Sequence, residues 1–198
     1  MQPEDIDHFF KVVSDHIDQP MRVGITGGTA ANLFGTVRNT LDIDFEYQSE
    51  LALDKVQHAI NQAEQQTGIA AEFADDIDHW GMISLADYRQ KLVPYKKIGH
   101  VDIYTLSVGH WSIGKLARYF EPDVQDLIQV FKKQNPTLDR LIEIWLNALS
   151  LSPKSPAQFE FKRHVVHFIQ EHGKGIWGKT FDSETFLKGF KAPNPKTL

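Results

Sequence analysis

Apolar positions in the first half of the chain follow two different periods. Residues 3–18 and 51–66 repeat apolar side chains every three or four positions, which predicts amphipathic helices. Shorter segments alternate apolar and polar residues, which is typical of strands. The predicted elements are helices at 3–18, 29–34 and 51–66 and strands at 21–25, 41–47, 69–73, 81–84 and 98–106.

Beyond residue 107 the strand pattern stops. The apolar spacing there predicts helices at 112–134, 137–149, 156–172 and 183–190. A mixed front half followed by an all-helical back half predicts an α/β (α+β) fold with a mixed sheet. We expect residues 1–107 to form the α/β core and residues 108–198 to form a helical lobe, with a ligand cleft between them.

The composition is that of an ordinary globular protein. Hydrophobic residues make up 41% of the 198 residues and charged residues 24%, which excludes a mainly disordered chain. The absence of cysteine excludes disulfides, thiolate zinc sites and cysteine nucleophiles. No apolar segment approaches the length of a membrane span, and residues 1–5 are acidic without an apolar signal core. We therefore expect a cytoplasmic protein without membrane contact.

The net charge of −5 is unevenly distributed along the chain. Residues 1–150 carry 13 lysines and arginines against 22 acidic residues, whereas residues 151–198 carry 8 against 4. An acidic body argues against a general duplex-DNA-binding protein, because phosphate contacts require a basic surface. The basic C-terminal part leaves room for contact with a polyanion.

Two aspartates two positions apart form the first candidate site. Asp42 and Asp44 alternate with the apolar Ile43 in a predicted strand, so both side chains leave the same face of that strand. Like charges at this spacing repel each other, and a divalent cation between them removes the cost. Carboxylate oxygens suit Mg²⁺, which is often bound by one or two carboxylates together with substrate phosphates.

A glycine pair precedes these aspartates, between a predicted strand and a predicted helix. Gly27 and Gly28 allow backbone N–H groups to approach a phosphate closely, and Thr29 adds a hydroxyl donor. A phosphate site next to a cation site predicts a place for a metal–nucleotide.

Asp102 is the third candidate carboxylate. It lies between two apolar residues in another predicted strand. If that strand lies beside the strand of Asp42 and Asp44, three carboxylates converge, and the third accepts a proton from an attacking hydroxyl or binds a second metal ion. We therefore predict Asp42, Asp44 and Asp102 as catalytic and metal-binding residues.

These residues resemble the signature of the nucleotidyltransferase superfamily with the DNA polymerase β-type catalytic fold. That signature is a Gly-Gly or Gly-Ser turn, then acid–apolar–acid on a strand, and a third acid on a later strand. Gly27-Gly28, Asp42-Ile43-Asp44 and Asp102 match it in order. Residues 27–44 look most like small stand-alone members such as the AbiEii-type toxins of type IV toxin–antitoxin systems, and antibiotic nucleotidyltransferases are similar over this segment too.

A second block also resembles the AbiEii-type group. Residues 113–118 followed by residues 123–127 are similar to its helical motif, in which a lysine is followed by two acids three positions apart. Lys115 and Asp126 belong to this block, and Pro122 stands where the group commonly has an arginine.

The resemblance implies metal-dependent transfer of a nucleoside monophosphate from an NTP to a hydroxyl, with release of pyrophosphate. Asp42 and Asp44 would hold Mg²⁺, and Asp102 would activate the acceptor. The nucleotide-binding residues would be Gly27, Gly28, Thr29, Arg38, Lys115 and Asp126, of which Arg38 and Lys115 neutralise phosphate charge. The implied acceptor is RNA, such as tRNA, or a protein, and an antitoxin protein is an implied partner.

Two other functions stay open. A small-molecule nucleotidyltransferase of the antibiotic-modifying kind has the same chemistry but needs an acidic pocket for a cationic drug. A nucleotide-binding or interaction module keeps the fold without catalysis. The basic residues after position 150 favour RNA or a protein partner over a cationic drug.

Overall fold

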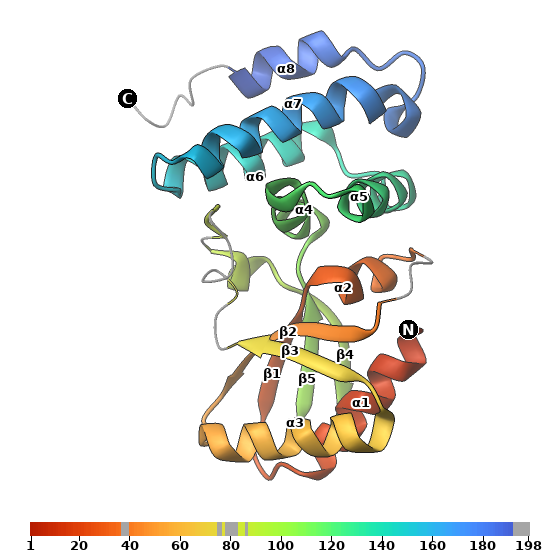
Figure 1. The fold of residues 1–198 in the computed structure, drawn as a ribbon, viewed down its shortest axis with the longest axis vertical. Coiled ribbons are helices and arrows are strands. Elements are labelled where there is room, and N and C mark those ends of the chain that lie inside the picture. The colour runs from red at the N-terminus through yellow and green to blue at the C-terminus, as the bar shows by residue number, and fades with distance from the viewer. Residues whose placement is uncertain (37–39, 75–76, 78–82, 86, 192–198) are drawn as a thin grey trace. The chain divides into compact units, whose positions relative to one another are not determined.

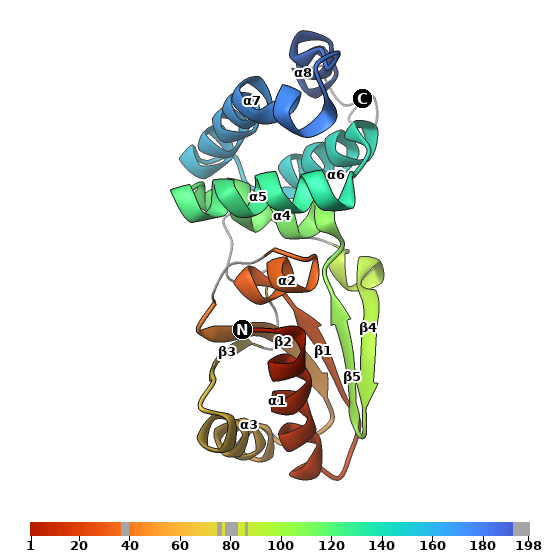
Figure 2. The same ribbon diagram turned by 90° about the vertical axis from the view of Figure 1, so that its right-hand side faces the viewer.

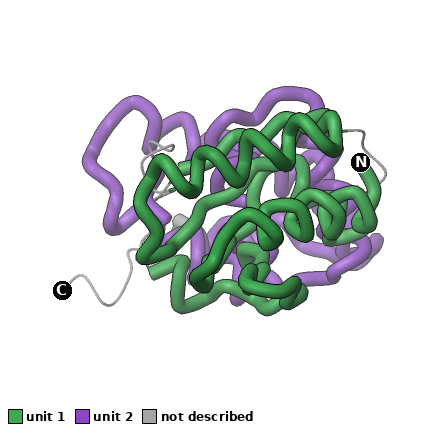
Figure 3. The backbone as a smooth tube through the Cα atoms, turned by 90° about the horizontal axis from the view of Figure 1, so that it is seen from below, with its two compact units in different colours: residues 1–77, 87–107 green, residues 78–86, 108–198 purple. Residues whose placement is uncertain are grey.

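The structure is a computed structural model that describes all residues except 37–39, 75–76, 78–82, 86 and 192–198. The chain divides into two compact units, residues 1–77 with 87–107 and residues 78–86 with 108–198 (Figure 3). The second unit includes residues 83–85, which the sequence assigned to the core. The Ser84 N–H donates a hydrogen bond to Ser152 Oγ at 2.8 Å, which ties this short segment to the helices.

A five-stranded mixed sheet forms the centre of the first unit (Figure 1), which confirms the predicted α/β fold class. The strand order is β3-β2-β1-β5-β4; β1 runs antiparallel to β2 and parallel to β5, β3 runs parallel to β2, and β4 runs antiparallel to β5. The elements of this unit are α1 (Pro3–Asp15), β1 (Met21–Ile25), α2 (Gly27–Leu33), β2 (Asp42–Ser49), α3 (Leu53–Thr67), β3 (Ala70–Ala74), the 3₁₀ helix η2 (Tyr88–Lys91), β4 (Val93–Ile98) and β5 (Val101–Thr105).

One face of the sheet is covered by α1 and α3, which lie side by side (Figure 2). Phe10 of α1 meets Phe45 of β2 with ring centroids 5.4 Å apart, and Phe45 stacks on Phe73 of β3 at 5.6 Å. Side chains alternate between the two faces along a strand. Because Phe45 is buried on this face, the adjacent residues of β2, Asp44 and Glu46, have their side chains on the other face. The apolar core therefore fixes which face of the sheet carries the acidic residues.

The predicted strand at 98–106 is wrong in its extent. The chain forms a hairpin there, in which β4 and β5 pair across Gly99 and His100. The pattern hid β4 because it lies at an edge of the sheet and carries Pro94 and exposed lysines. Residues 81 and 82 of the strand predicted at 81–84 lie outside the described residues, and positions 83 and 84 are not in a strand.

The second unit is helical, as predicted. Its helices are α4 (Val108–Arg118), α5 (Glu121–Gln134), α6 (Leu138–Leu151), α7 (Pro156–Trp177) and α8 (Ser183–Lys191). The single helix predicted at 112–134 is instead two helices, because Tyr119 adopts a left-handed conformation with φ of 58°. The fully buried Trp145 of α6 packs near the rings of Phe131 and Phe186. Within the described residues, none of the helices has the length and apolar character to cross a bilayer.

Candidate active site

Asp42 and Asp44 lie at the beginning of β2. Ile43 and Phe45, which alternate with them, are fully buried, so both aspartates leave the opposite face of the sheet, where they are half-buried. The Thr26 N–H donates to the backbone oxygen of Asp44 at 2.9 Å. This bond holds the start of β2 beside the end of β1, so the two carboxylates lie next to the glycine turn that follows β1.

Glu72 of β3 supplies a third carboxylate at this position. It lies opposite Asp44 in the register of the two parallel strands. One oxygen from each of Asp42, Asp44 and Glu72 lies within 4.8 Å of the others. Sequence reasoning missed Glu72, although the signal was present: strands that follow one another in the chain are usually neighbours in the sheet.

Asp102 does not join this group, and the premise behind its predicted convergence is wrong. β5 pairs with β1, so β1 separates Asp102 from the strand of Asp42 and Asp44. Asp102 lies opposite Arg22, which in turn lies opposite Gln48. Gln48 is four positions beyond Asp44, about 13 Å along the strand at about 3.3 Å per residue. The Asp102 carboxylate instead accepts a hydrogen bond from Lys97 Nζ at 2.8 Å.

The glycine turn is built around the carboxylate of Asp44. Gly28 donates its N–H to Asp44 Oδ2 at 3.1 Å, and a Cβ on Gly27 would lie 1.7 Å from the same oxygen. Thr29 Oγ1 donates to the backbone oxygen of Asp42 at 3.0 Å. Gly28 and Thr29, two of the predicted phosphate-binding residues, therefore form hydrogen bonds with the two aspartates. Their contact with phosphate stays a prediction.

Thr40 is a second residue that sequence reasoning missed. Its hydroxyl donates to Asp42 Oδ1 at 2.9 Å, so each of the two aspartate carboxylates has a hydrogen-bond donor that fixes its orientation. Arg38, predicted to neutralise phosphate charge, lies outside the described residues.

We expect Gly27→Ala to damage the site. Gly27 has φ of 58°, where a side chain costs about 1–2 kcal/mol. The new methyl group would also displace the carboxylate of Asp44. The free energy of unfolding should fall by about 2–4 kcal/mol, combining backbone strain with overpacking. Urea unfolding measures this loss, and Mg²⁺-dependent nucleotide binding should fall with it.

Gly114→Ala is the matched control for this substitution. Nothing lies within 4 Å of a Cβ placed on Gly114, which is an exposed position of helix α4. Alanine is a better helix former than glycine by about 1 kcal/mol, so this variant should be at least as stable as the parent. Equal stability of the Gly27 and Gly114 variants would contradict the tight fit around Asp44.

Lys115 and Asp126, which belong to the second block of the resemblance, form an ion pair in the second unit. Lys115 Nζ lies 2.8 Å from Asp126 Oδ2 and 3.1 Å from Asp123 Oδ1, and the lysine side chain is only 2% exposed. Arg118 reaches the same Asp123 oxygen at 2.8 Å. The two acids three positions apart in α5 thus converge on a single lysine of α4. Contact of Lys115 or Asp126 with a nucleotide stays a prediction.

The mixed sheet and the carboxylates beside a glycine turn are consistent with the nucleotidyltransferase fold that the sequence resembles. Over residues 4–171 the chain matches the model of a family described as "Nucleotidyltransferase of unknown function (DUF6036)", and it belongs to that family. No curated protein and no solved structure matches the chain.

Proposed function

We propose that this protein transfers a nucleoside monophosphate from an NTP to a hydroxyl acceptor, with Mg²⁺ as cofactor. The observation that carries the proposal is the group of Asp42, Asp44 and Glu72, with one oxygen of each within 4.8 Å of the others, beside a glycine turn. Membership of a nucleotidyltransferase family supports the reaction class. In this proposal Glu72 takes the place that the sequence assigned to Asp102.

The three carboxylates suit a divalent cation. At 4.8 Å a pair of negative charges repels by about 1–3 kcal/mol, for effective dielectrics between that of water and about 20. Oxygen ligands of this kind match the preference of Mg²⁺. Asp42, Asp44 and Glu72 would hold the ion. When bound, Mg²⁺ neutralises charge on the phosphates and orients them for in-line attack.

The residues of the chain would position the reactants and accept one proton. The acceptor hydroxyl oxygen forms a bond to the α-phosphorus, the bond to the β-phosphate oxygen breaks, and pyrophosphate leaves with that electron pair. The exposed carboxylate of Glu72 would take the hydroxyl proton. Gly28 and Thr40 would keep the carboxylates of Asp44 and Asp42 in place, so that little reorganisation accompanies the reaction.

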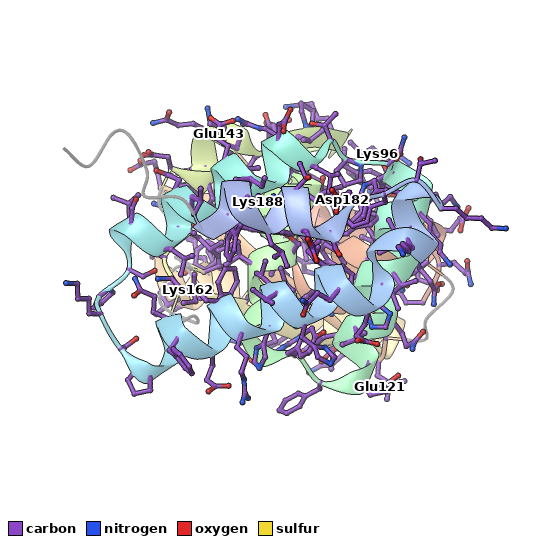
Figure 4. All side chains as sticks on the ribbon, turned by 90° about the horizontal axis from the view of Figure 1, so that it is seen from above. Lys96, Glu121, Glu143, Lys162, Asp182 and Lys188 are labelled. Carbon is purple, nitrogen blue, oxygen red and sulfur yellow. The ribbon has the colours of Figure 1, made fainter. Side chains whose placement is uncertain are left out.

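The acceptor we propose is RNA, with a toxin-like role and an antitoxin partner. Support comes from the charge of residues 151–198, which contain eight basic and four acidic residues. Lys162 of α7 and Lys188 of α8, labelled in Figure 4, are exposed members of this set. A basic surface attracts a phosphate backbone irrespective of its sequence.

Label transfer tests the proposed function. Each α-³²P-labelled NTP is incubated with Mg²⁺, bacterial extract and the parent protein, Glu72→Gln or Asp102→Asn. We expect label in RNA with the parent and about 10²- to 10⁴-fold less with Glu72→Gln, the range for losing a general base. Asp102→Asn should stay within about threefold of the parent, because it lies away from the site.

The other outcomes have defined meanings. If transfer is abolished in Asp102→Asn but kept in Glu72→Gln, Asp102 is the third catalytic carboxylate, as predicted from the sequence, and Glu72 is not. Label in a small molecule instead of RNA would favour the antibiotic-modifying kind of enzyme. Binding of Mg-NTP without label in any acceptor would favour a non-catalytic module.

A further inference from the structure

Arg22 places a positive charge in β1, the central strand of the sheet. It lies opposite Gln48, which is four positions beyond Asp44 in β2. Positions an even number apart on a strand share a face, so Arg22 lies on the face that carries the acidic group, about 13 Å along the strand from it. Helices α1 and α3 cover the other face (Figure 2).

Arg22 has no acidic partner among the residues that the structure describes. Asp102 lies directly opposite it in β5, but the Asp102 carboxylate accepts its hydrogen bond from Lys97 Nζ at 2.8 Å. The guanidinium of Arg22 instead lies over the ring of Tyr104, with Cζ 4.2 Å from the ring centroid. A cation–π contact orients an arginine without neutralising it, so Arg22 keeps its full positive charge.

The guanidinium also has an unmet hydrogen bond. Arg22 Nε is buried without a partner, and no other side-chain nitrogen or oxygen of the described chain is in that state. Burying a donor without a partner costs free energy, and folded proteins rarely leave such groups. Because Nη1 and Nη2 are not buried in this way, the outer end of the guanidinium is accessible to a ligand.

Two further polar side chains flank this guanidinium. Gln48 lies opposite Arg22 in β2, Tyr104 lies beneath it in β5, and both are half-buried. Within the described residues, neither the Gln48 amide nor the Tyr104 hydroxyl forms a hydrogen bond. Three neighbouring strands therefore offer N–H and O–H donors around one uncompensated positive charge, which suits an oxyanion.

The donor set matches a phosphate group. The planar fork of an arginine donates two parallel hydrogen bonds to phosphate oxygens. Amide and hydroxyl side chains are common further donors to phosphate. A carboxylate has only two oxygens, which the arginine fork alone can occupy, whereas a phosphate keeps further oxygens for the donors of Gln48 and Tyr104.

We propose that Arg22, Gln48 and Tyr104 bind a phosphate group on this face of the sheet. The site is separate from the acidic group, because the buried Glu46 lies between Gln48 and Asp44 in β2. The inference therefore goes beyond the proposed function and does not depend on it.

The direct test follows the Arg22 side chain itself. The Nε–H signals of arginines are recorded in ¹H–¹⁵N spectra while inorganic phosphate is added in the presence of EDTA, with sodium chloride at equal ionic strength as the reference. We expect the signal of Arg22, assigned by its absence in Arg22→Met, to shift with phosphate. The matched signal is that of Arg140, an exposed arginine of α6 paired with Glu143, which should not shift.

Phosphate affinity should depend on these side chains to different degrees. Arg22→Met should weaken binding by about 10- to 100-fold, the range for losing charge-assisted hydrogen bonds. Tyr104→Phe keeps the ring under the guanidinium but loses the hydroxyl, so it should weaken binding by about two- to tenfold. Asp44→Asn should bind phosphate as the parent does, because it lies outside this site.

Melting temperatures distinguish a ligand-binding arginine from a structural one. Without phosphate, Arg22→Met removes a buried donor that has no partner and keeps the apolar stem, so its melting temperature should equal or exceed that of the parent. Phosphate should then raise the melting temperature of the parent but not that of Arg22→Met.

Three probes distinguish the sources of the phosphate: inorganic phosphate, AMP, and a single-stranded RNA oligonucleotide without terminal phosphates. The probe that binds most tightly in an Arg22-dependent way identifies free phosphate, a mononucleotide or an RNA backbone as the ligand. The inference is overturned if no probe shifts the Arg22 signal, or if Arg22→Met binds every probe as the parent does. Loss of all phosphate binding in Asp44→Asn would also overturn it, because the phosphate would then lie at the acidic group.

Discussion

Asp44→Asn should lower nucleotidyl transfer by at least about 10³-fold while leaving the protein folded. Asp44 lies opposite Glu72 and on the same face as Asp42, within the acidic group. If the group holds Mg²⁺ as proposed, losing one negative charge from it would weaken metal binding, and a metal ion supplies several kcal/mol of stabilisation to the transition state. Asparagine keeps the size of the side chain and an oxygen that can accept the Gly28 N–H.

Stability measurements give this variant a readout that does not depend on finding the acceptor. Without Mg²⁺, removing one of three mutually repelling carboxylates should leave the melting temperature unchanged or slightly raised. Adding Mg²⁺ should raise the melting temperature of the parent, because an ion that binds only the folded state stabilises it. Asp44→Asn should lose most of that increase.

The matched control is Asp15→Asn, an exposed aspartate at the end of α1. It should behave as the parent does in both label transfer and magnesium titration. Label transfer by Asp44→Asn at the rate of the parent would contradict the assignment of the metal site. An equal increase in melting temperature on adding Mg²⁺ would place the ion elsewhere.

Local periodicity predicted the elements around the site well. The residues within β1, α3 and the start of β2 were enough to predict these elements. Gly68, predicted to end α3, does so in the left-handed conformation. Asp42 and Asp44 could be found for the same reason, because two positions on one strand share a face whatever surrounds them. The class of fold followed from the order of these elements.

Strand order is a non-local property, and the third carboxylate depended on it. Asp102 and Glu72 each lie in a short strand, β5 and β3, between less polar residues. The residues of these two strands do not indicate which of them lies beside β2. The sheet places β3 beside β2 and β5 beside β1. Packing between residues far apart in the chain decides this, and alternation within a strand carries no information about it.

The interruption between α4 and α5 was missed for a different reason. Apolar spacing continues across positions 119 and 120, and it was given more weight than Pro122, which the structure places in the first turn of α5. The structure ends α4 before Tyr119, and Asp123 accepts a hydrogen bond from the Phe120 N–H at 3.4 Å, which caps the start of α5. That cap uses the same aspartate that pairs with Lys115, so the turn and the buried ion pair form together.

Lys115→Met should lower the free energy of unfolding by about 3–5 kcal/mol, the usual cost of removing one partner from a buried ion pair. Methionine keeps the apolar stem but leaves two carboxylates in the interior, with Asp126 only 1% exposed. Asp123 keeps Arg118, so Asp126 is the acid left without this cation. Urea unfolding measures the loss, and Lys132→Met, an exposed lysine of α5, should change stability by no more than about 0.5 kcal/mol.

Adding Asp126→Asn to Lys115→Met should recover a large part of the lost stability, because the neutral amide no longer needs a buried cation. A double variant no more stable than Lys115→Met would show that the lysine contributes through packing against α4 and α5 and not through its charge.

The stable double variant also tests the nucleotide-binding role that the resemblance gave to Lys115. If it binds Mg-NTP analogues as the parent does, Lys115 and Asp126 organise the junction of α4 and α5. If it is stable but has lost that binding, the pair contributes to the nucleotide site as well, because the fold alone would no longer account for the loss.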